Sequence, residues 1–315
     1  MAVGSLAGTA ADSPLGSSSS FFYGGQAVLE GVLMRGPADW AVAARRPDGT
    51  IAVRQDRLRS PVYRNRFFKL PFIRGVVGLV EMLHLGTSAM MWSANVKIAS
   101  EDIEIGPGAI AVTITASLAF SIVLFFGLPL LAGSALQRHG SSLAFTAVEG
   151  ATRAILLVGY LGLISMIPDV KRVFMYHGAE HKTINAFESG APMTVEGVRP
   201  QSRLHPRCGT GFLVVVVFVS IIVFAFVGRP SLPLLLLSRV LLVPVIASVA
   251  YELIRLGARY RANPVVKRLI VPQLAAQYLT TREPDDGMIE VAVTAFRTVR
   301  ERERPSETGQ EELIV

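Results

Sequence analysis

Long apolar runs alternate with short polar segments along most of this chain. Four of these runs come close to the roughly 20 apolar residues that a bilayer-spanning helix requires. They cover residues 109–135, 144–167, 211–227 and 232–254. The pattern predicts a mainly α polytopic membrane protein, in which residues 109–254 form a four-helix membrane domain.

A fifth apolar stretch, residues 71–98, carries polar side chains on one side of a helix. These are Arg74, Glu81, His84 and Ser88. A narrow polar stripe is typical of a helix that lies at the membrane interface or packs against other helices. We therefore predict an interfacial helix here, and we interpret His84 as structural.

The N-terminal part reads as a tail followed by a small β region. Residues 1–20 are rich in Ala, Gly and Ser, which predicts a disordered tail rather than a cleaved signal peptide. Within residues 21–70, Pro47-Asp48-Gly49 lies between two β-prone runs and predicts a hairpin. The preceding run, residues 24–37, is too glycine-rich to be expected as a plain strand.

The C-terminal part, residues 255–315, is polar enough for a soluble region. Pro284-Asp285-Asp286 predicts the start of a helix with acidic residues in its first turn. Apolar residues then recur at helical spacing from Met288 to Val299. We expect this stripe to dock on the N-terminal β region, and we expect the last dozen residues to be mobile.

The distribution of Lys and Arg predicts how the chain is oriented in the membrane. The chain has a net charge of +7, and Lys and Arg number 11 in residues 1–106, 6 in 168–210 and 10 in 255–315. With four spans, these three segments fall on one side, which the positive-inside rule makes cytoplasmic. We therefore expect a multi-pass protein of the cell (inner) membrane with both termini in the cytoplasm. No nucleic-acid-binding signature accompanies the charge.

The candidate chemistry is concentrated in residues 176–208. His177 and His181 are four residues apart and share one face of a helix, with Glu180 between them. This H-x-x-E-H spacing suits two metal ligands and a carboxylate that acts as a general base. His205 and Cys208 add two further donors, and the four together match the coordination number of zinc.

The sequence allows two metal-bound arrangements of these donors and a third arrangement without a metal. If all four donors bind, the site is closed and structural. If three bind, one position remains open and Glu180 can act as the base. A set of hydrogen-bonded histidines without an ion is the third interpretation. Glu188 shares the face of His177 but lies about 10 Å beyond His181, so we expect it outside the ligand set.

Several further residues are candidates for support of this site or for substrate contact. Glu30 and Arg35 are predicted to pair with each other or to reach the metal site, or to remain ordinary surface charges. Arg207 and Arg35 are candidates for binding an anionic group of a substrate, and Gln26 is a further candidate near the site.

Charges inside the predicted spans are costly and therefore are candidate functional groups as well. Arg239 and Glu252 lie in the fourth apolar run, and Glu149 and Arg153 are one turn apart near the start of the second. A Glu149–Arg153 pair, or long side chains that reach the interface, is the simpler interpretation of these charges.

Four motifs together resemble a known family. They are Gly24 to Pro37, Tyr176 to Thr183, His205 to Thr210 and Leu279 to Asp286. These segments are similar to the landmarks of the YqhQ family (domain of unknown function 1385), bacterial integral membrane proteins described as metal-dependent enzymes. The resemblance implies a multi-pass membrane protein and supports a divalent metal ion, with zinc expected. It supplies no substrate.

The sequence thus supports three hypotheses. The leading one is a metal-dependent hydrolase at the membrane surface, with zinc on His177, His181 and His205 or Cys208. The second is a non-enzymatic scaffold or assembly factor with a structural His/Cys site. The third is a transporter, for which Arg239 and Glu252 are the support. The lipid bilayer is the expected partner, beside a second copy or another membrane protein.

Overall fold

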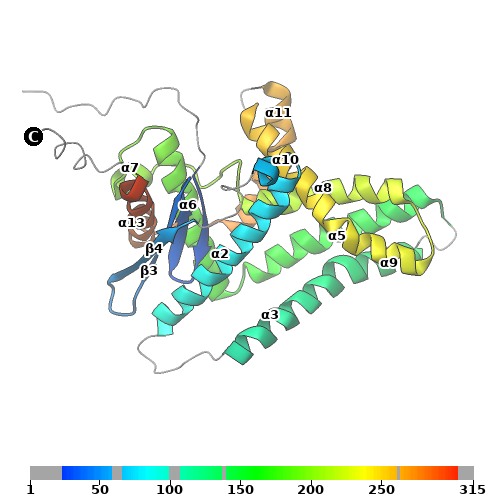
Figure 1. Ribbon diagram of the computed structural model, residues 1–315, viewed down its shortest axis with the longest axis horizontal. Helices are drawn as coiled ribbons and strands as arrows, with labels where there is room; N and C mark the ends of the chain where they lie inside the picture. Colours follow the sequence, from blue (N-terminus) through cyan, green and yellow to red (C-terminus); the bar gives the residue numbers. More distant parts are fainter. Residues whose placement is uncertain (1–22, 59–65, 99–106, 137–139, 261–262, 304–315) are drawn as a thin grey trace, which may run out of the picture.

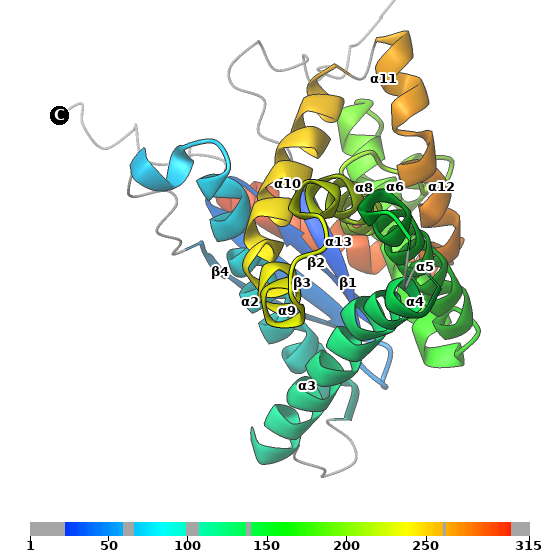
Figure 2. The same cartoon turned by 90° about the vertical axis from the view of Figure 1, so that its right-hand side faces the viewer.

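The computed structural model describes residues 23–58, 66–98, 107–136, 140–260 and 263–303. The predicted tail at residues 1–20 and the last dozen residues lie outside these ranges. A small sheet flanked by helices is joined to a bundle of long apolar helices, which extends to the right in Figure 1. Figure 2 looks along this bundle from its far end, with the sheet behind it.

The sheet has four antiparallel strands in sequence order. They are β1 (Gly24–Val28), β2 (Gly31–Arg35), β3 (Asp39–Arg45) and β4 (Ile51–Arg57). The predicted hairpin is confirmed, since β3 and β4 pair through a turn in which Gly49 has a φ of 87°.

The expectation that residues 24–37 would not form plain strands is wrong, because they form β1 and β2. The glycines fit the sheet through close packing. A Cβ atom at Gly25 would overlap the carbonyl oxygen of Leu33, and one at Gly31 would overlap that of Ala43. Small residues at these points let neighbouring backbones approach, which is one of the uses of glycine in a strand.

Helices cover both faces of the sheet. On one face lie α6 (Pro168–Glu188) and α13 (Asp286–Glu303), and on the other lies α2 (Ile73–Ile98). The apolar stripe of α13, which includes Met288 and Val299, is buried against the sheet and α6. The predicted docking of this stripe on the β region is therefore confirmed.

The bundle contains the helices that are long and apolar enough to cross a membrane. The first span runs through α3 (Pro107–Ile122), a π-helical segment η2 (Val123–Gly127) and α4 (Leu128–Leu136). The second is α5 (Ser142–Ile164), and the third is α8 (Gly209–Val227). A fourth candidate is a pair bent by 41°, α9 (Leu232–Leu241) and α10 (Val243–Arg259). Pro244 at the start of α10 suits this break.

The described chain thus has three such helices, or four if the bent pair is one span, and α2 is not among them. Short elements complete the fold. They are η1 (Arg66–Lys69), α7 (Val195–Val198), α11 (Pro264–Leu269) and α12 (Val271–Thr280).

Three charged side chains meet in the interior of the bundle, and we name them the Arg–Glu–Arg triad. Glu149 accepts hydrogen bonds from Arg153 at 2.9 Å and from Arg239 Nε at 3.0 Å. The Arg153 side chain also donates to Ser220 Oγ at 3.0 Å and to the carbonyl of Phe125 in the π-helical segment. The predicted Glu149–Arg153 pair is confirmed, and Arg239 joins it.

Glu252 has a partner outside the bundle core. Its carboxylate accepts a hydrogen bond from Arg74 Nε at 2.7 Å, which connects α10 to α2. Arg239 and Glu252 are therefore both engaged by opposite charges within the fold. These pairings give both residues a structural role within the fold.

Candidate metal centre

The helix α6 carries most of the candidate residues and has clear ends. Pro168 occupies its first turn, where a missing N–H costs nothing, and Gly190, with a φ of 71°, follows its last turn. The helix begins nine residues before His177, so His177 and His181 lie near its middle. Gly178 brings it close to the carbonyl of Arg282, which leaves no room for a side chain.

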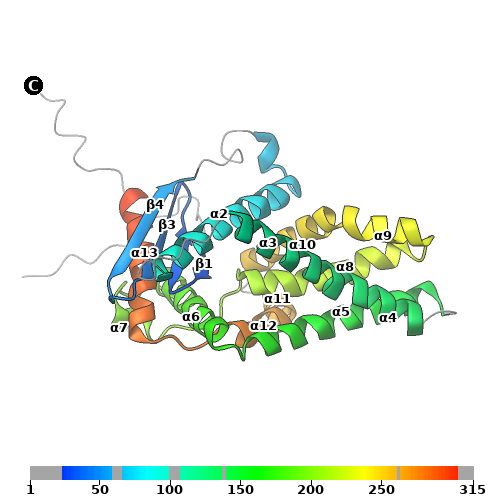
Figure 3. The same cartoon turned by 90° about the horizontal axis from the view of Figure 1, so that it is seen from below.

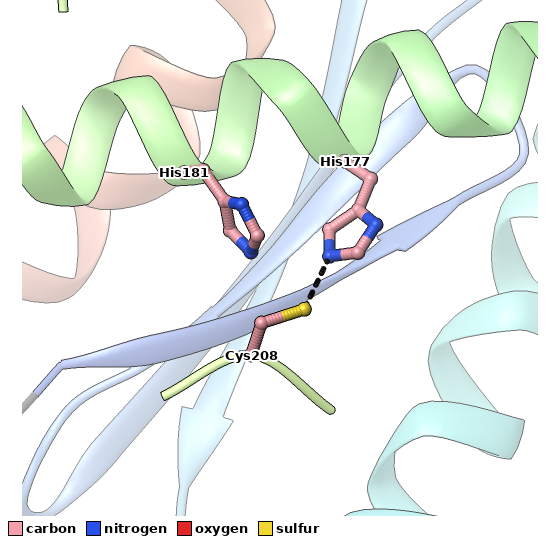
Figure 4. Close-up of side chains that lie close together, drawn as sticks. All are labelled: His177, His181 and Cys208. Carbon is pink, nitrogen blue, oxygen red and sulfur yellow. Dashed lines mark hydrogen bonds between the residues drawn. The ribbon is translucent and has the colours of Figure 1, made fainter. Parts of the chain in front are cut away.

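Three of the four predicted donors converge. One ligand atom from each of His177, His181 and Cys208 lies within 4.8 Å of the others. Figure 4 shows the two imidazoles side by side on α6, with Cys208 below them, and His177 Nε2 is 3.2 Å from Cys208 Sγ. Zinc bonds of about 2.0–2.3 Å place tetrahedral ligand atoms roughly 3.3–3.8 Å apart. The three donors therefore fit one zinc-type ion after small side-chain movements.

Backbone carbonyls fix the orientation of both imidazoles. His177 Nδ1 is 2.8 Å from the carbonyl oxygen of Thr280, and His181 Nδ1 is 2.6 Å from that of Arg203. Because a carbonyl oxygen only accepts, each Nδ1 carries a proton, and in the neutral ring Nε2 then keeps a lone pair. Histidines that bind metals are commonly held in this way by a partner on the other ring nitrogen. The lone pairs of both rings are thus available at the same place.

Cys208 reaches the cluster from the start of α8, a helix long and apolar enough to cross a membrane. It is the N-cap residue of α8, is 5% exposed, and its Sγ accepts the Thr210 N–H at 3.4 Å. A helix N-terminus favours negative charge on the group that caps it. The sulfur is therefore held at the N-terminus of α8, within reach of both imidazoles.

His205 lies beside the three donors and not among them. Its ring is 5.6 Å from that of His181, centroid to centroid, and its Nε2 is 3.9 Å from a carboxylate oxygen of Glu188. Gln277 accepts the N–H of His205 and donates to its carbonyl, both at 2.8 Å. Burial lowers the pKa of His205 to about 4, so this imidazole is neutral at physiological pH.

Glu180 is buried between α6 and β1, outside the group of three donors. Burial raises the pKa of its carboxyl to about 7, opposed by the charge of His177 and by a hydrogen bond from the Gly25 N–H. The side chain is 5% exposed. A buried carboxyl that exchanges a proton near neutral pH has the properties of a general acid or base.

Glu188 and Arg207 form an ion pair next to His205. The ion pair with Arg207 and the nearby ring of His205, 3.9 Å away, outweigh the effect of burial and hold the pKa of Glu188 at about 2. Glu188 therefore supports the 205–208 turn from outside the three donors. Arg207 already holds a carboxylate, which leaves less of its charge for a substrate.

Three other candidates are placed away from the donors. Glu30 accepts hydrogen bonds from Arg172 and does not pair with Arg35, which instead contacts Glu81 of α2 at 3.0 Å. Of the alternatives left open for Glu30 and Arg35, a pair between the two is therefore excluded, because their side chains point to helices on opposite faces of the sheet. Gln26 also faces α2, where it lies against Gly86.

No role is predicted for α12 from the sequence, yet this helix supports the cluster. Its last residue, Thr280, supplies the carbonyl that orients His177, and Gln277 holds the backbone of His205. Gln277 is fully buried. The signal in the sequence was the motif from Leu279 to Asp286, which includes Thr280 but points to no contact by itself.

Comparison with known proteins places these features in a wider group. Residues 70–302 match a family described as a protein of unknown function (DUF1385). The uncharacterized protein YqhQ of Bacillus subtilis (strain 168) is 37% identical over 310 residues, which cover 91% of this chain and 95% of that protein. No solved structure matches the chain.

Proposed function

This chain belongs to the DUF1385 family, and we propose that it is a membrane protein with a zinc-type site that acts as a hydrolase at the membrane surface. The observation that carries the proposal is the convergence of His177 Nε2, His181 Nε2 and Cys208 Sγ. Both histidines have their Nδ1 atoms hydrogen-bonded to backbone carbonyls, which is the arrangement of metal-ligating imidazoles.

The site would lie at the cytoplasmic surface of the membrane. Cys208 directly precedes Gly209, the first residue of the third apolar helix, so the donors stand where this helix would leave the bilayer. The density of Lys and Arg in residues 168–210 supports a cytoplasmic position for this segment.

Three protein donors leave one position of a tetrahedral ion free, as in catalytic zinc sites. His177, His181 and Cys208 would hold the ion, which supplies Lewis acidity and a nucleophile at neutral pH. Glu180 would take up and return the proton. Its carboxylate is next in sequence to one ligand, interacts with the charge of His177, and is held by the N–H of Gly25.

A structural site is the second candidate, and the position of His205 favours it. This imidazole lies beside His181, and no hydrogen bond engages its buried Nε2 among the described residues. A rotation of the side chain would make it the fourth ligand and close the site. In that case the ion would join α6, the 205–208 turn and α8 without catalysis.

Metal analysis of the gently purified protein tests the shared premise. We expect about one zinc ion per chain, which His177→Ala and Cys208→Ser abolish. Protein free of bound transition metal would refute both candidates.

Two substitutions then separate the candidates. Glu180→Gln should retain the metal and abolish turnover in a panel of fluorogenic peptides, esters and phosphoesters. His205→Ala should retain both metal and turnover if the site is open. Loss of metal in His205→Ala would establish the closed, structural site instead.

A further inference from the structure

The end of α10 and the short helix α11 carry positive charges that the fold leaves without ion pairs. Residues 253–282 contain six Lys or Arg and no Asp or Glu. Arg259, Lys267 and Arg268 are exposed, and none of the three has an ion pair among the described residues. We name the described residues of 255–271 the basic arm.

Large apolar side chains are exposed on the same arm. Five of them have 50–73% of their surface exposed, namely Leu256, Tyr260, Val265, Leu269 and Val271. The guanidinium of Arg259 lies over the ring of Tyr260, 5.7 Å from its centroid. Apolar and aromatic side chains that alternate with Lys and Arg are typical of helices at the boundary between headgroups and acyl chains.

Contacts of α12 fix the position of this arm relative to the bundle. α12 follows α11 and packs on the start of α8, where the side chain of Gln273 lies against Gly211. Thr280 Oγ1 donates to Thr210 Oγ1 at 3.0 Å. Figure 1 shows α11 and α12 running upward, across the direction in which α5 and α8 extend to the right. The arm therefore lies across the end of the bundle that carries the candidate metal centre.

Position and charge together select the occupant of this surface. A bilayer that surrounds α5 and α8 would meet the arm at the level of its headgroups, where acidic lipids supply negative charge. The acidic residue nearest in sequence, Glu252, is already held by Arg74. A second copy would present the same cations and be repelled. Nucleic acid offers phosphates but no apolar phase for Leu269.

We propose that the basic arm binds the headgroups of acidic phospholipids. The cations of α10 and α11 would contact lipid phosphates, while the exposed apolar side chains reach the acyl chains beside them. Such contacts would hold the end of the bundle with the candidate metal centre against an anionic leaflet. The inference goes beyond the proposed hydrolase and requires no metal ion.

A comparison of two lipids on the wild-type protein tests the proposal. We would measure the binding of fluorescent dioctanoyl phosphatidylglycerol and of the matched phosphatidylcholine to the full-length protein in a non-ionic detergent, by fluorescence anisotropy. We expect phosphatidylglycerol to bind about tenfold more tightly at low salt, and we expect the preference to shrink as salt screens the charges. Equal affinities for the two lipids at low salt would overturn the proposal.

A triple variant assigns the preference to the arm. Arg259→Gln, Lys267→Gln and Arg268→Gln together remove the exposed cations and keep the apolar side chains. We expect this variant to bind the two lipids equally, with an unchanged Tm because the three side chains have no ion pairs to lose. A preference for phosphatidylglycerol that survives in the folded variant would overturn the proposal. The wild-type comparison does not depend on the folding of this variant.

A matched variant on the sheet controls for net charge. Arg46→Gln, Arg54→Gln and Arg57→Gln together change the charge by the same amount at exposed positions in and beside β3 and β4. We expect this protein to keep the preference of the wild type. An equal loss of preference in both variants would show that total charge, and not the arm, attracts the lipid, which would overturn the proposal.

Competition with other polyanions separates lipid from the remaining occupants. Poly-glutamate and a short RNA should displace labelled phosphatidylglycerol poorly, because neither receives the apolar side chains. Tight binding of either one, together with equal affinities for the two lipids, would assign the arm to an acidic protein or to RNA and overturn the proposal. A preference for phosphatidylglycerol in protein that holds no metal would support the basic arm while the hydrolase proposal fails.

Discussion

Two buried polar clusters of this protein differ in where their hydrogen-bonding groups point. In the Arg–Glu–Arg triad of the bundle, Glu149 receives both arginines, and Arg153 also engages Ser220 and a helix carbonyl. In the His177, His181 and Cys208 cluster, only the outer ring nitrogens are engaged by carbonyls. The inner atoms of the cluster face one another instead.

The difference indicates different roles for the two clusters. A charged group that is satisfied by protein partners joins helices and has little capacity left for a ligand. The cluster has a hydrogen bond between Cys208 Sγ and His177 Nε2 at 3.2 Å, and a cation could replace the proton of that bond and engage one atom of each of the three residues. We therefore interpret the triad as a structural element and the cluster as a candidate metal-binding site.

Removal of Glu149 should give the largest effect. Glu149→Gln leaves Arg153 and Arg239 without their anion inside the bundle, and we expect a loss of about 3–5 kcal/mol. The fall in Tm in detergent would measure it. Replacement of all three charges by Leu and Met should restore much of the stability, because the unpaired charges are then gone.

A wild-type Tm after Glu149→Gln would break the comparison, since the triad would then contribute nothing to the fold. Arg74→Met is a useful companion. It breaks the partly exposed contact with Glu252 and should cost less than the loss of Glu149.

Metal removal should give the second largest effect. An ion present at 100 times its dissociation constant stabilises the native state by about 2.7 kcal/mol. A chelator should therefore lower the Tm of the wild-type protein but not that of His177→Ala or Cys208→Ser. A chelator response that survives in both variants would place the ion elsewhere.

Loss of the support from α12 should have a smaller effect. Gln277→Leu leaves the N–H and C=O of His205 without their partner, which costs about 1–3 kcal/mol. Because the 205–208 turn carries Cys208, we also expect metal affinity to fall about tenfold. Competition with a chromophoric zinc chelator measures the affinity, and a change in Tm without a change in affinity would separate the turn from the site.

The smallest effect is expected at an ion pair on the surface. Arg199 and Asp286 hold each other at 2.6 Å, but both side chains are more than half exposed. Asp286→Asn should leave Tm and metal content unchanged, because exposed pairs are screened by water and salt. A large loss here would mean that burial does not control the contribution of charges in this protein.

Local pattern was sufficient for several elements. The apolar runs, the Pro47-Asp48-Gly49 turn and the stripe on α13 each follow from residues that are close in sequence. The strands β1 and β2 were missed because Gly25 and Gly31 are explained by contact with other strands and, for Gly25, with α6. The same limit applies to Arg35, whose partner Glu81 lies on a separate helix.

The sequence by itself determined the long apolar helices that could cross a membrane, the family and the set of candidate donors, since hydrophobicity and motif spacing are properties of neighbouring residues. Tertiary structure alone decided that His177, His181 and Cys208 converge while His205 stands aside. The physical reason is that distant backbone groups set these directions. The carbonyls of Arg203 and Thr280 turn the two rings of α6, and Gln277 fixes the turn that contains His205.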